Sequence, residues 1–330
     1  MKRKFETGME YPIKGEDTYI FQIARDLIRQ LEEMYGPGET RRQAHPKMHA
    51  LLKGEFIVEP NLREDLKVGV FQHEKTFPCW IRLSSSSTKI QDDVKKDVRG
   101  FAIKLTGVPG EKLITKEEGD DTQDFLLVSM PTFPIGNIRQ FQKFLAIITR
   151  GKMGKLLLPQ NWSSLLTAMR FKKSFVKTSN LLQIPYWSTV PYQFGDVDRA
   201  VKYQVVPQNA QVDPMPKNPK SWYLREAIQK TLSVSEVSYD FMIQFQEDPK
   251  AMPIENAQIK WKSGFIKVAT IRIPRQEFAS QEQDILGQNL DFSPWHSLPA
   301  HRPLGGLNRA RRIIYHSMAT YRKRRNGVAV

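Results

Sequence analysis

The spacing of apolar residues along the chain predicts helices near both ends and in the middle. Apolar side chains recur at steps of three and four over residues 17–35, where a Gly-Pro-Gly sequence follows, and again over 307–325. This period is typical of amphipathic helices with one buried face. A basic segment between residues 137 and 182 has the same character. We therefore expect helices in these three regions.

Between these regions the pattern favours strands. Tyr239, Phe241, Ile243 and Phe245 alternate with polar residues, as expected for a strand with one buried side. Similar runs predict strands near residues 55–58, 75–85, 99–107, 122–130, 200–207, 239–246 and 267–274. The Pro- and Asn-rich segment 205–222 predicts a loop. Together these elements indicate one α+β domain over residues 1–330, built around an antiparallel barrel.

Composition and charge limit the classes of protein that remain. The chain has 330 residues, 40% of them hydrophobic, which is enough for a sizeable core. No apolar run is long enough to span a membrane, so we expect neither a transmembrane helix nor a secretory leader. The single cysteine, Cys79, suits a reducing cytoplasm. We expect a cytoplasmic protein in which Cys79 is buried.

Basic residues exceed acidic ones by a wide margin. Lys and Arg number 50 against 35 Asp and Glu, a formal net charge of +15. Such a surface attracts anions. Because neither zinc-finger spacing nor an RNA-recognition consensus is present, nucleic acid is an unlikely partner, whereas peripheral contact with an anionic membrane stays open.

Arg311 and Tyr315 lie four residues apart on one face of the last predicted helix. At this spacing the guanidinium can reach the phenol oxygen one turn away. A nearby positive charge stabilises a phenolate, which is the form in which tyrosine ligates haem iron. For an isolated pair of this kind, a core tyrosine with an arginine partner is the simpler reading, so other residues must decide.

Three further segments decide in favour of a known family. They are AHRPLGGLNRARRIIY at 300–315, an R-x-x-H-x-K pattern at 42–47 and a D-x-R-G-x-A-x-K pattern at 97–104. With them, nearly the whole chain resembles the haem catalases, and most closely the short catalase-like haem proteins. The resemblance implies an eight-stranded antiparallel barrel with surrounding helices, and haem b as cofactor.

The resemblance also assigns roles to individual residues. Tyr315 would be the axial ligand of the iron, and Arg311 would support its phenolate. His45 would be the acid and base above the haem, because imidazole can accept and return a proton near neutral pH. Ser84 would orient His45. The remaining matches are Arg42, Arg82 and Arg322 as partners of the haem propionates, and Phe141 with Phe133 and Phe144 beside the distal face.

Two further positions carry expectations. Gly100 is read as a backbone requirement within a structural turn. Val128 stands where the large catalases carry an asparagine that donates to bound peroxide, and valine donates nothing. Ser129 or Met130 would restore polarity there if the register slipped. Loss of such a donor costs about two to three orders of magnitude in rate. Weak catalase activity is therefore expected.

The preferred function is a haem-dependent peroxidase acting on organic or fatty-acid hydroperoxides, with an external electron donor. One alternative is a hydroperoxide isomerase or lyase of the allene oxide synthase type, although Ala44 stands where those enzymes carry threonine. A second alternative is an inactive, basic binding protein on the same scaffold. The oligomeric state stays open.

Overall fold

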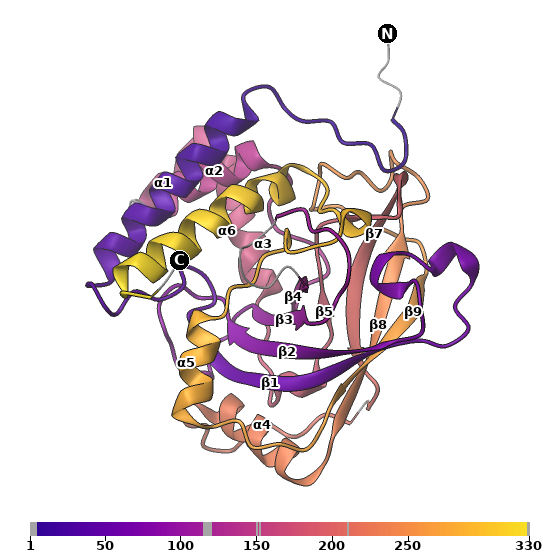
Figure 1. Ribbon diagram of the computed structural model, residues 1–330. Coiled ribbons are helices and arrows are strands. Elements are labelled where there is room, and N and C mark those ends of the chain that lie inside the picture. The colour runs from indigo at the N-terminus through magenta and orange to yellow at the C-terminus, as the bar shows by residue number, and fades with distance from the viewer. Residues whose placement is uncertain (1–4, 115–120, 150, 152, 210, 329–330) are drawn as a thin grey trace.

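A computed structural model shows the strands gathered on one side of the molecule and α1, α2 and α6 on the other (Figure 1). The structure describes residues 5–114, 121–149, 151, 153–209 and 211–328. The helices are α1 (Glu16–Met34), α2 (Ile138–Ile148), α3 (Trp162–Ser174), α4 (Tyr223–Val234), α5 (Gln281–Asn289) and α6 (Gly306–Arg325).

Nine strands belong to one sheet within the described residues. They are β1 (Lys47–Val58), β2 (Thr76–Ser85), β3 (Arg99–Leu105), β4 (Gln123–Val128), β5 (Tyr186–Trp187), β6 (Tyr192–Phe194), β7 (Asp196–Pro207), β8 (Val237–Phe245) and β9 (Phe265–Ile273). The order is β5-β4-β3-β2-β1-β9-β8-β7-β6, and β5 also pairs with β7. This last pairing closes an antiparallel barrel of eight strands, with β6 attached to β7, as the resemblance implied.

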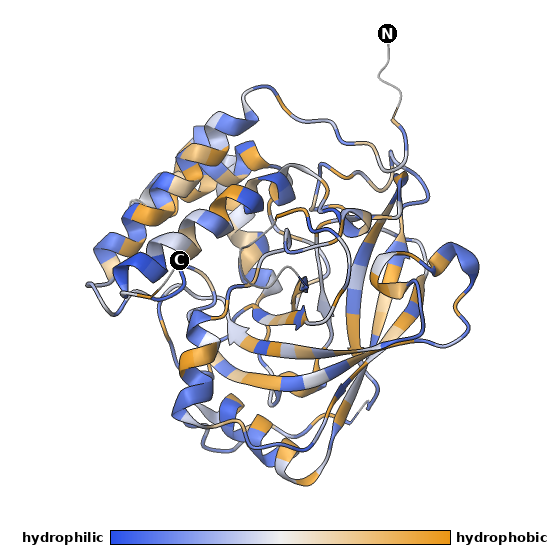
Figure 2. Cartoon of the chain, in the orientation of Figure 1, coloured by the Kyte–Doolittle hydropathy of each residue, from blue (hydrophilic) through white to orange (hydrophobic). Residues whose placement is uncertain are grey.

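Aromatic side chains fill the barrel. Phe241 on β8 lies 5.0 Å from Phe56 on β1 and 4.9 Å from Phe125 on β4, measured between ring centroids. All three are fully buried. Apolar and polar residues alternate along the strands (Figure 2). Alternate side chains of a strand point to opposite faces of the sheet. The side chains that do not point into the barrel therefore lie on its outer face, where they can contribute to a site.

Several elements differ from the sequence-based expectation. The first strand begins at Lys47 and not near residue 55. The sequence pattern missed its first half because residues 47–52 are buried on both faces and show no alternation of apolar and polar side chains. The short strands β5 and β6 and the helices α4 and α5 were not predicted. The helices expected at 17–35 and 307–325 are present as α1 and α6 within one residue, and α2 and α3 occupy the expected basic segment.

Candidate functional site

A row of paired residues crosses three strands on the outer face of the barrel. Ser84 on β2 pairs with Gly100 on β3, which pairs with Val128 on β4. Directly paired residues in an antiparallel sheet present their side chains on the same face. The neighbouring row, with Phe101, points into the aromatic core. Val128 therefore shares the face that carries Ser84.

Neither residue proposed as a polar substitute for Val128 takes its place in the sheet. The register between β3 and β4 is continuous and pairs Val128 with Gly100. The hydroxyl of Ser129 accepts a hydrogen bond from the backbone N–H of Arg99 at 2.9 Å. Met130 is buried. The register slip that would have restored polarity is absent from this part of the sheet.

His45 lies against this row. Its Nδ1 is 3.0 Å from the Ser84 hydroxyl, the contact that the sequence analysis expected. A Cβ added at Gly100 would lie 2.6 Å from the same nitrogen. The φ of His45 is 60°, a left-handed value that is uncommon outside glycine. The backbone strain and the bare glycine together place the imidazole over Gly100.

This geometry corrects our reading of Gly100. We interpreted it as a backbone requirement, but its φ is not in the left-handed region. The added Cβ would also lie 2.7 Å from the Ser84 hydroxyl. The glycine is needed because a side chain would occupy the space of the His45 ring.

The surroundings of His45 keep it neutral. Burial and the positive charge of Arg82 lower its pKa to about 4, with further lowering by Arg42 and Arg311 and an opposing effect of Asp97. An imidazole with this pKa is unprotonated at neutral pH and available as a proton acceptor. The charge of Arg311 affects the pKa of His45, so helix α6, which carries Arg311, lies near the row formed by Ser84, Gly100 and Val128.

Arg42 and Arg82 both reach the carboxyl end of α5. Arg82 Nε donates to the carbonyl oxygen of Gly287 at 3.3 Å, and its Nη2 donates to the carbonyl of His45 at 3.0 Å. Arg42 Nη2 donates to the carbonyls of Gly287, at 3.3 Å, and Leu290. Cations are favourable at a helix C-terminus. These contacts hold both guanidinium groups next to the C-terminal end of α5.

Arg322 of α6 joins the same group. It forms an ion pair with Asp291 at 2.8 Å, while its Nε is buried without a hydrogen-bond partner in the described part of the chain. Burial and the charge of Arg322 lower the pKa of Arg82 to about 9. Burial and the charges of Arg82 and Arg322 lower the pKa of Arg42 well below its ordinary value. The three arginines therefore form a cluster that Asp291 neutralises only in part.

Arg311 and Tyr315 make the contact expected from their spacing. Arg311 Nη2 donates to the Tyr315 hydroxyl oxygen at 3.0 Å, and Nη1 donates to Asn308 Oδ1 at 3.1 Å. Tyr192 on β6 also accepts from Nη1 at 3.5 Å. Burial opposes the charge of Arg311, but the two tyrosine oxygens raise its pKa above the ordinary value. Arg311 thus stays a cation at the Tyr315 oxygen.

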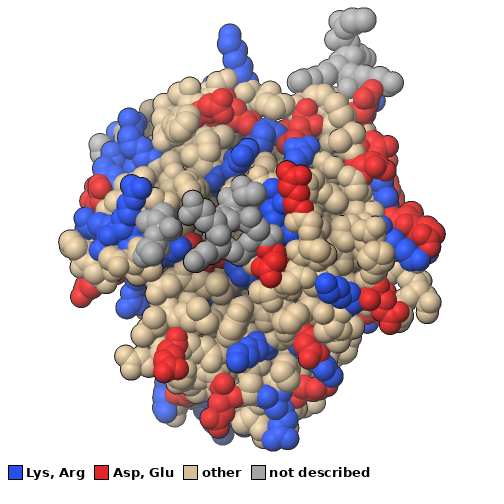
Figure 3. Space-filling view, viewed as in Figure 1, with Lys and Arg blue, Asp and Glu red and all other residues tan. Residues whose placement is uncertain are grey.

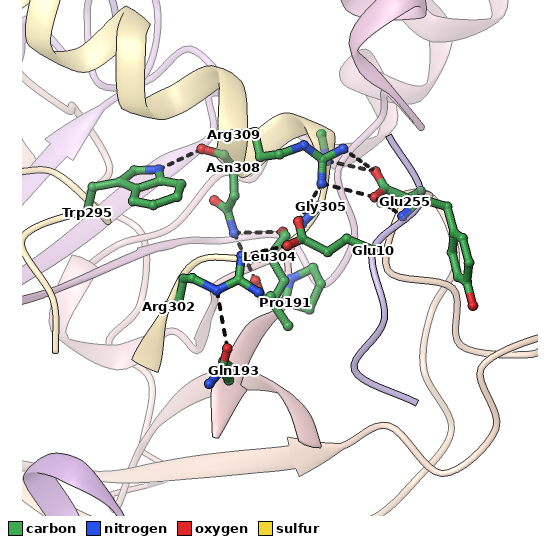
Figure 4. A network of polar contacts seen from close by, with 12 residues as sticks. Glu10, Pro191, Gln193, Glu255, Trp295, Arg302, Leu304, Gly305, Asn308 and Arg309 are labelled. Carbon is green, nitrogen blue, oxygen red and sulfur yellow. Dashed lines mark hydrogen bonds and ion pairs between the residues drawn. The ribbon is translucent and has the colours of Figure 1, made fainter. Parts of the chain in front are cut away.

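The N-terminus of α6 is held by carboxylates from distant parts of the chain (Figure 4). Glu10 accepts from the backbone N–H of Gly305 at 2.7 Å, and Glu255 accepts from that of Gly306 at 2.8 Å. Arg309 pairs with both acids and with Glu16. Anionic groups are favourable at a helix N-terminus. This network sets the position of the helix that carries Arg311 and Tyr315.

The three expected phenylalanines lie together at α2. Phe133 contacts Phe141 edge to face, with centroids 6.4 Å apart, and Phe171 of α3 stacks on Phe144 at 5.5 Å. Phe144 is buried, whereas Phe133 and Phe141 are partly buried. The roles of Phe133 and Phe141 beside a cofactor stay predictions.

Several contributors to the site were not expected from the sequence. They are Gly287, Leu290 and Asp291 around the arginines, and Asn308 and Tyr192 around Arg311. Asn308 precedes Arg311 by three residues on one helix, so its contact could have been predicted. The others come from segments far away in sequence, and no local pattern indicates them.

Comparison with known proteins identifies the fold. No family model matches the sequence, and no curated protein matches it. The structure has a catalase-like fold. It superimposes on a fungal catalase with a TM-score of 0.66 at 17% identity, covering 98% of this chain and 66% of that one.

Two further structures agree. Catalase A from Saccharomyces cerevisiae matches with a TM-score of 0.67 at 17% identity, over 98% of this chain and 68% of its own. A bacterial catalase matches with a TM-score of 0.63 at 16% identity, over 94% and 62%. The chain thus spans about two thirds of the length of the catalases it matches.

The residues at the site fit a dianionic, iron-containing porphyrin. Two carboxylates of such a group would complement the arginine cluster, including the Nε of Arg322, for which the described residues offer no hydrogen-bond partner. A phenol oxygen that accepts a hydrogen bond from a cation would suit an iron ligand, and a neutral imidazole near the arginines would suit a proton acceptor.

Proposed function

We propose that this chain is a haem-dependent peroxidase that reduces organic or fatty-acid hydroperoxides to alcohols and water, with electrons from an external donor. The catalase-like fold is that of enzymes named catalases, which supports a catalase-type or peroxidase function in general. The observation that carries the proposal is the arrangement of Arg42, Arg82 and Arg322 beside His45 and the Arg311–Tyr315 pair.

The proposed cofactor would be held by the residues of this cluster. Tyr315 would ligate the iron, with Arg311 stabilising the phenolate through the contact already present. Arg42, Arg82 and Arg322 would bind the propionates. When bound, haem b would supply the electrons that cleave the O–O bond of the hydroperoxide.

His45 would move the protons. In the tautomer in which Nδ1–H donates to the Ser84 hydroxyl oxygen, 3.0 Å away, Nε2 would carry a free lone pair. Nε2 can accept the proton of the hydroperoxide and then transfer it to the oxygen that leaves. A pKa of about 4 ensures that the acceptor form is present at neutral pH. Ser84 thus acts as a positioning residue for the tautomer.

The apolar side chain of Val128 supports an organic hydroperoxide, and not hydrogen peroxide, as the proposed substrate. It stands in the row that carries Ser84 and Gly100, and it offers a methyl surface where a hydrogen-bond donor would favour hydrogen peroxide. An apolar surface gains by contact with the alkyl chain of an organic hydroperoxide. We therefore expect faster turnover of alkyl hydroperoxides than of hydrogen peroxide.

Assays with and without a reductant test this proposal. Purified protein supplied with haem is mixed with cumene hydroperoxide, a fatty-acid hydroperoxide or hydrogen peroxide, and products are identified. The proposal expects alcohol formation that consumes the electron donor. Rearranged products formed without the donor would show the isomerase alternative instead. Absence of turnover with a fully haem-loaded protein would contradict both activities.

A further inference from the structure

The chain between Asp124 and Asp196 has an uneven charge distribution. Residues 125–195 include nine lysines and arginines and no aspartate or glutamate. Residues 292–330 also lack acidic groups and include eight lysines and arginines. On the face of the molecule drawn in Figure 3, acidic and basic groups are interspersed. This basic segment contains α2 and α3 and the short 3-10 helices Met153–Leu157 and Pro159–Asn161.

Helix α3 carries larger apolar side chains on its exposed side than is usual for a surface helix. The buried side presents the small polar residues Ser164 and Thr167, together with Phe171. On the opposite side Trp162 is 60% exposed and Met169 is 50% exposed. A surface helix normally turns its large apolar residues towards the core. The exposed side of α3 is therefore unusual in carrying a tryptophan and a methionine.

Neighbouring residues extend this surface. Leu157 is 75% exposed and Leu158 is 41% exposed, in a segment that packs against α3. Exposed cations occur among these residues. We define the α3 surface as Lys155, Leu157, Leu158, Trp162, Met169, Arg170, Lys172 and Lys173, all of them exposed. It thus combines large apolar side chains with positive charge.

We propose that the α3 surface binds the headgroup region of an anionic lipid membrane. Tryptophan is favoured at the boundary between headgroups and acyl chains, where leucine and methionine can bury apolar area. Lysine and arginine are attracted to acidic headgroups at the same time. None of the residues of the α3 surface is acidic, nor is any other residue between 125 and 195.

A second copy of the chain is a poorer match for this surface. In a two-fold symmetric contact each surface faces itself, so the cations of one copy would lie opposite those of the other. Like charges brought together with little solvent between them oppose association. A lipid surface supplies both apolar and anionic groups.

Flotation with lipid vesicles tests the inference directly. The full chain is mixed with vesicles of phosphatidylcholine alone or of phosphatidylcholine with phosphatidylglycerol, at low and high salt. We expect binding to the anionic vesicles only, weakened at high salt because the Debye length shortens. Equal recovery with both compositions, or no binding to either, would overturn the proposal.

Variants locate the contact. Replacing Lys172→Gln and Lys173→Gln together should weaken binding to anionic vesicles about 25-fold, since each cation near the bilayer contributes roughly fivefold. Trp162→Ser with Leu157→Ser should weaken it also. The matched control is Lys230→Gln with Val234→Ser on α4, where Val234 is 70% exposed, and it should bind as the wild type does.

Measurement of molecular mass in solution separates lipid from a second copy. We expect the wild type and the Trp162→Ser, Leu157→Ser variant to have the same mass. A wild-type dimer that this variant dissociates would show that the α3 surface pairs with itself, and would overturn the proposal. These outcomes do not depend on haem. Only the consequence, delivery of lipid hydroperoxides to the site, rests on the proposed function.

Discussion

The position of the His45 ring depends on the absence of a side chain at Gly100. The imidazole of His45 occupies the space above it, and the Ser84 hydroxyl lies beside both. His45 also has a positive φ, a strained conformation that persists only where the surrounding structure holds it. The pattern at 97–104 marked this glycine in the sequence, but only the fold shows what it makes room for.

Replacing Gly100 by alanine should move His45. The new Cβ would lie 2.6 Å from Nδ1, so the ring must shift and lose its contact with Ser84. We expect turnover of hydroperoxide to fall by about 100-fold, the usual contribution of a positioned acid or base. Gly264→Ala is the control, because an added Cβ there meets nothing within 4 Å. Equal activity of Gly100→Ala and wild type would contradict this placement.

Val128 should decide between hydrogen peroxide and larger substrates. We expect Val128→Asn to raise the turnover of hydrogen peroxide by about 100-fold, because the amide supplies a donor in the row of Ser84 and Gly100. The control Val128→Ala changes size without adding a donor and should give no such gain. Oxygen release under peroxide measures the effect. A gain with alanine equal to that with asparagine would refute the hydrogen-bond argument.

The low pKa of His45 predicts how stability depends on pH. In the unfolded chain histidine titrates near 6.5, whereas burial and Arg82 lower the folded value to about 4. Between these values the unfolded state binds more protons, so the free energy of unfolding falls as the pH decreases from 6.5 towards 4. His45 should account for about 2 kcal/mol of the loss between pH 7 and pH 5.

Urea unfolding of haem-free protein at both pH values measures this loss. His45→Gln should reduce the loss by about that 2 kcal/mol. It should leave the remainder, since burial also lowers the pKa of His49 and of His301. An unchanged loss in His45→Gln would show that the imidazole is protonated equally in both states.

At the scale of elements, the position of α6 depends on three carboxylates from two other parts of the chain. Arg309 pairs with Glu10 and Glu16 from the N-terminal region and with Glu255 from the loop after β8. Burial would raise the pKa of Glu10, but hydrogen bonds from Arg302 and Gly305 and the charge of Arg309 lower it. Its contribution to stability is thus present above the unfolded pKa and lost as pH falls through the folded value.

Arg309→Leu should therefore destabilise the protein and loosen α6. Removing one partner from a largely buried network costs about 3 kcal/mol, because the remaining carboxylates lose their counter-charge. Arg272→Leu breaks the exposed ion pair with Glu55 and should cost less than about 1 kcal/mol. Chemical denaturation compares the two variants. Similar losses in both would contradict the role given to the Arg309 network.

The elements also show what the sequence can predict. The strand at residues 237–245 was found because its two faces differ, and α1 because its apolar stripe is continuous. Helix α5 has no such stripe, and its Ile285 and Leu286 are exposed, so nothing local predicts it. Helix α4 carries such a pattern, with buried Leu224, Ile228 and Leu232 at four-residue steps, but the pattern is short and directly follows the proline-rich loop.

At the scale of the whole molecule, the succession of strands indicated an antiparallel barrel but not which strands close it. The closing contact involves β5, which has two residues and pairs with both β4 and β7. A strand this short has no measurable period. Likewise, the three arginines of the cluster come from the segment before β1, from strand β2 and from helix α6. Only the folded chain shows that these arginines lie close together.

None of the helices in the part of the chain that the structure describes is long and apolar enough to cross a membrane. Helix α3 exposes the apolar residues Trp162 and Met169 and the basic residues Arg170, Lys172 and Lys173. Their charge contributes to the net +15 of the chain.

Haem binding by wild type and Tyr315→Phe, followed by absorption spectroscopy, tests the central claim most directly. We predict that wild type binds haem with the spectrum of a tyrosine-ligated iron. The variant should bind it more than about tenfold more weakly, since even loss of a residue that supports a metal ligand costs about 10–100-fold. His45→Ala should keep the wild-type spectrum. An unchanged spectrum and affinity in Tyr315→Phe would contradict the account.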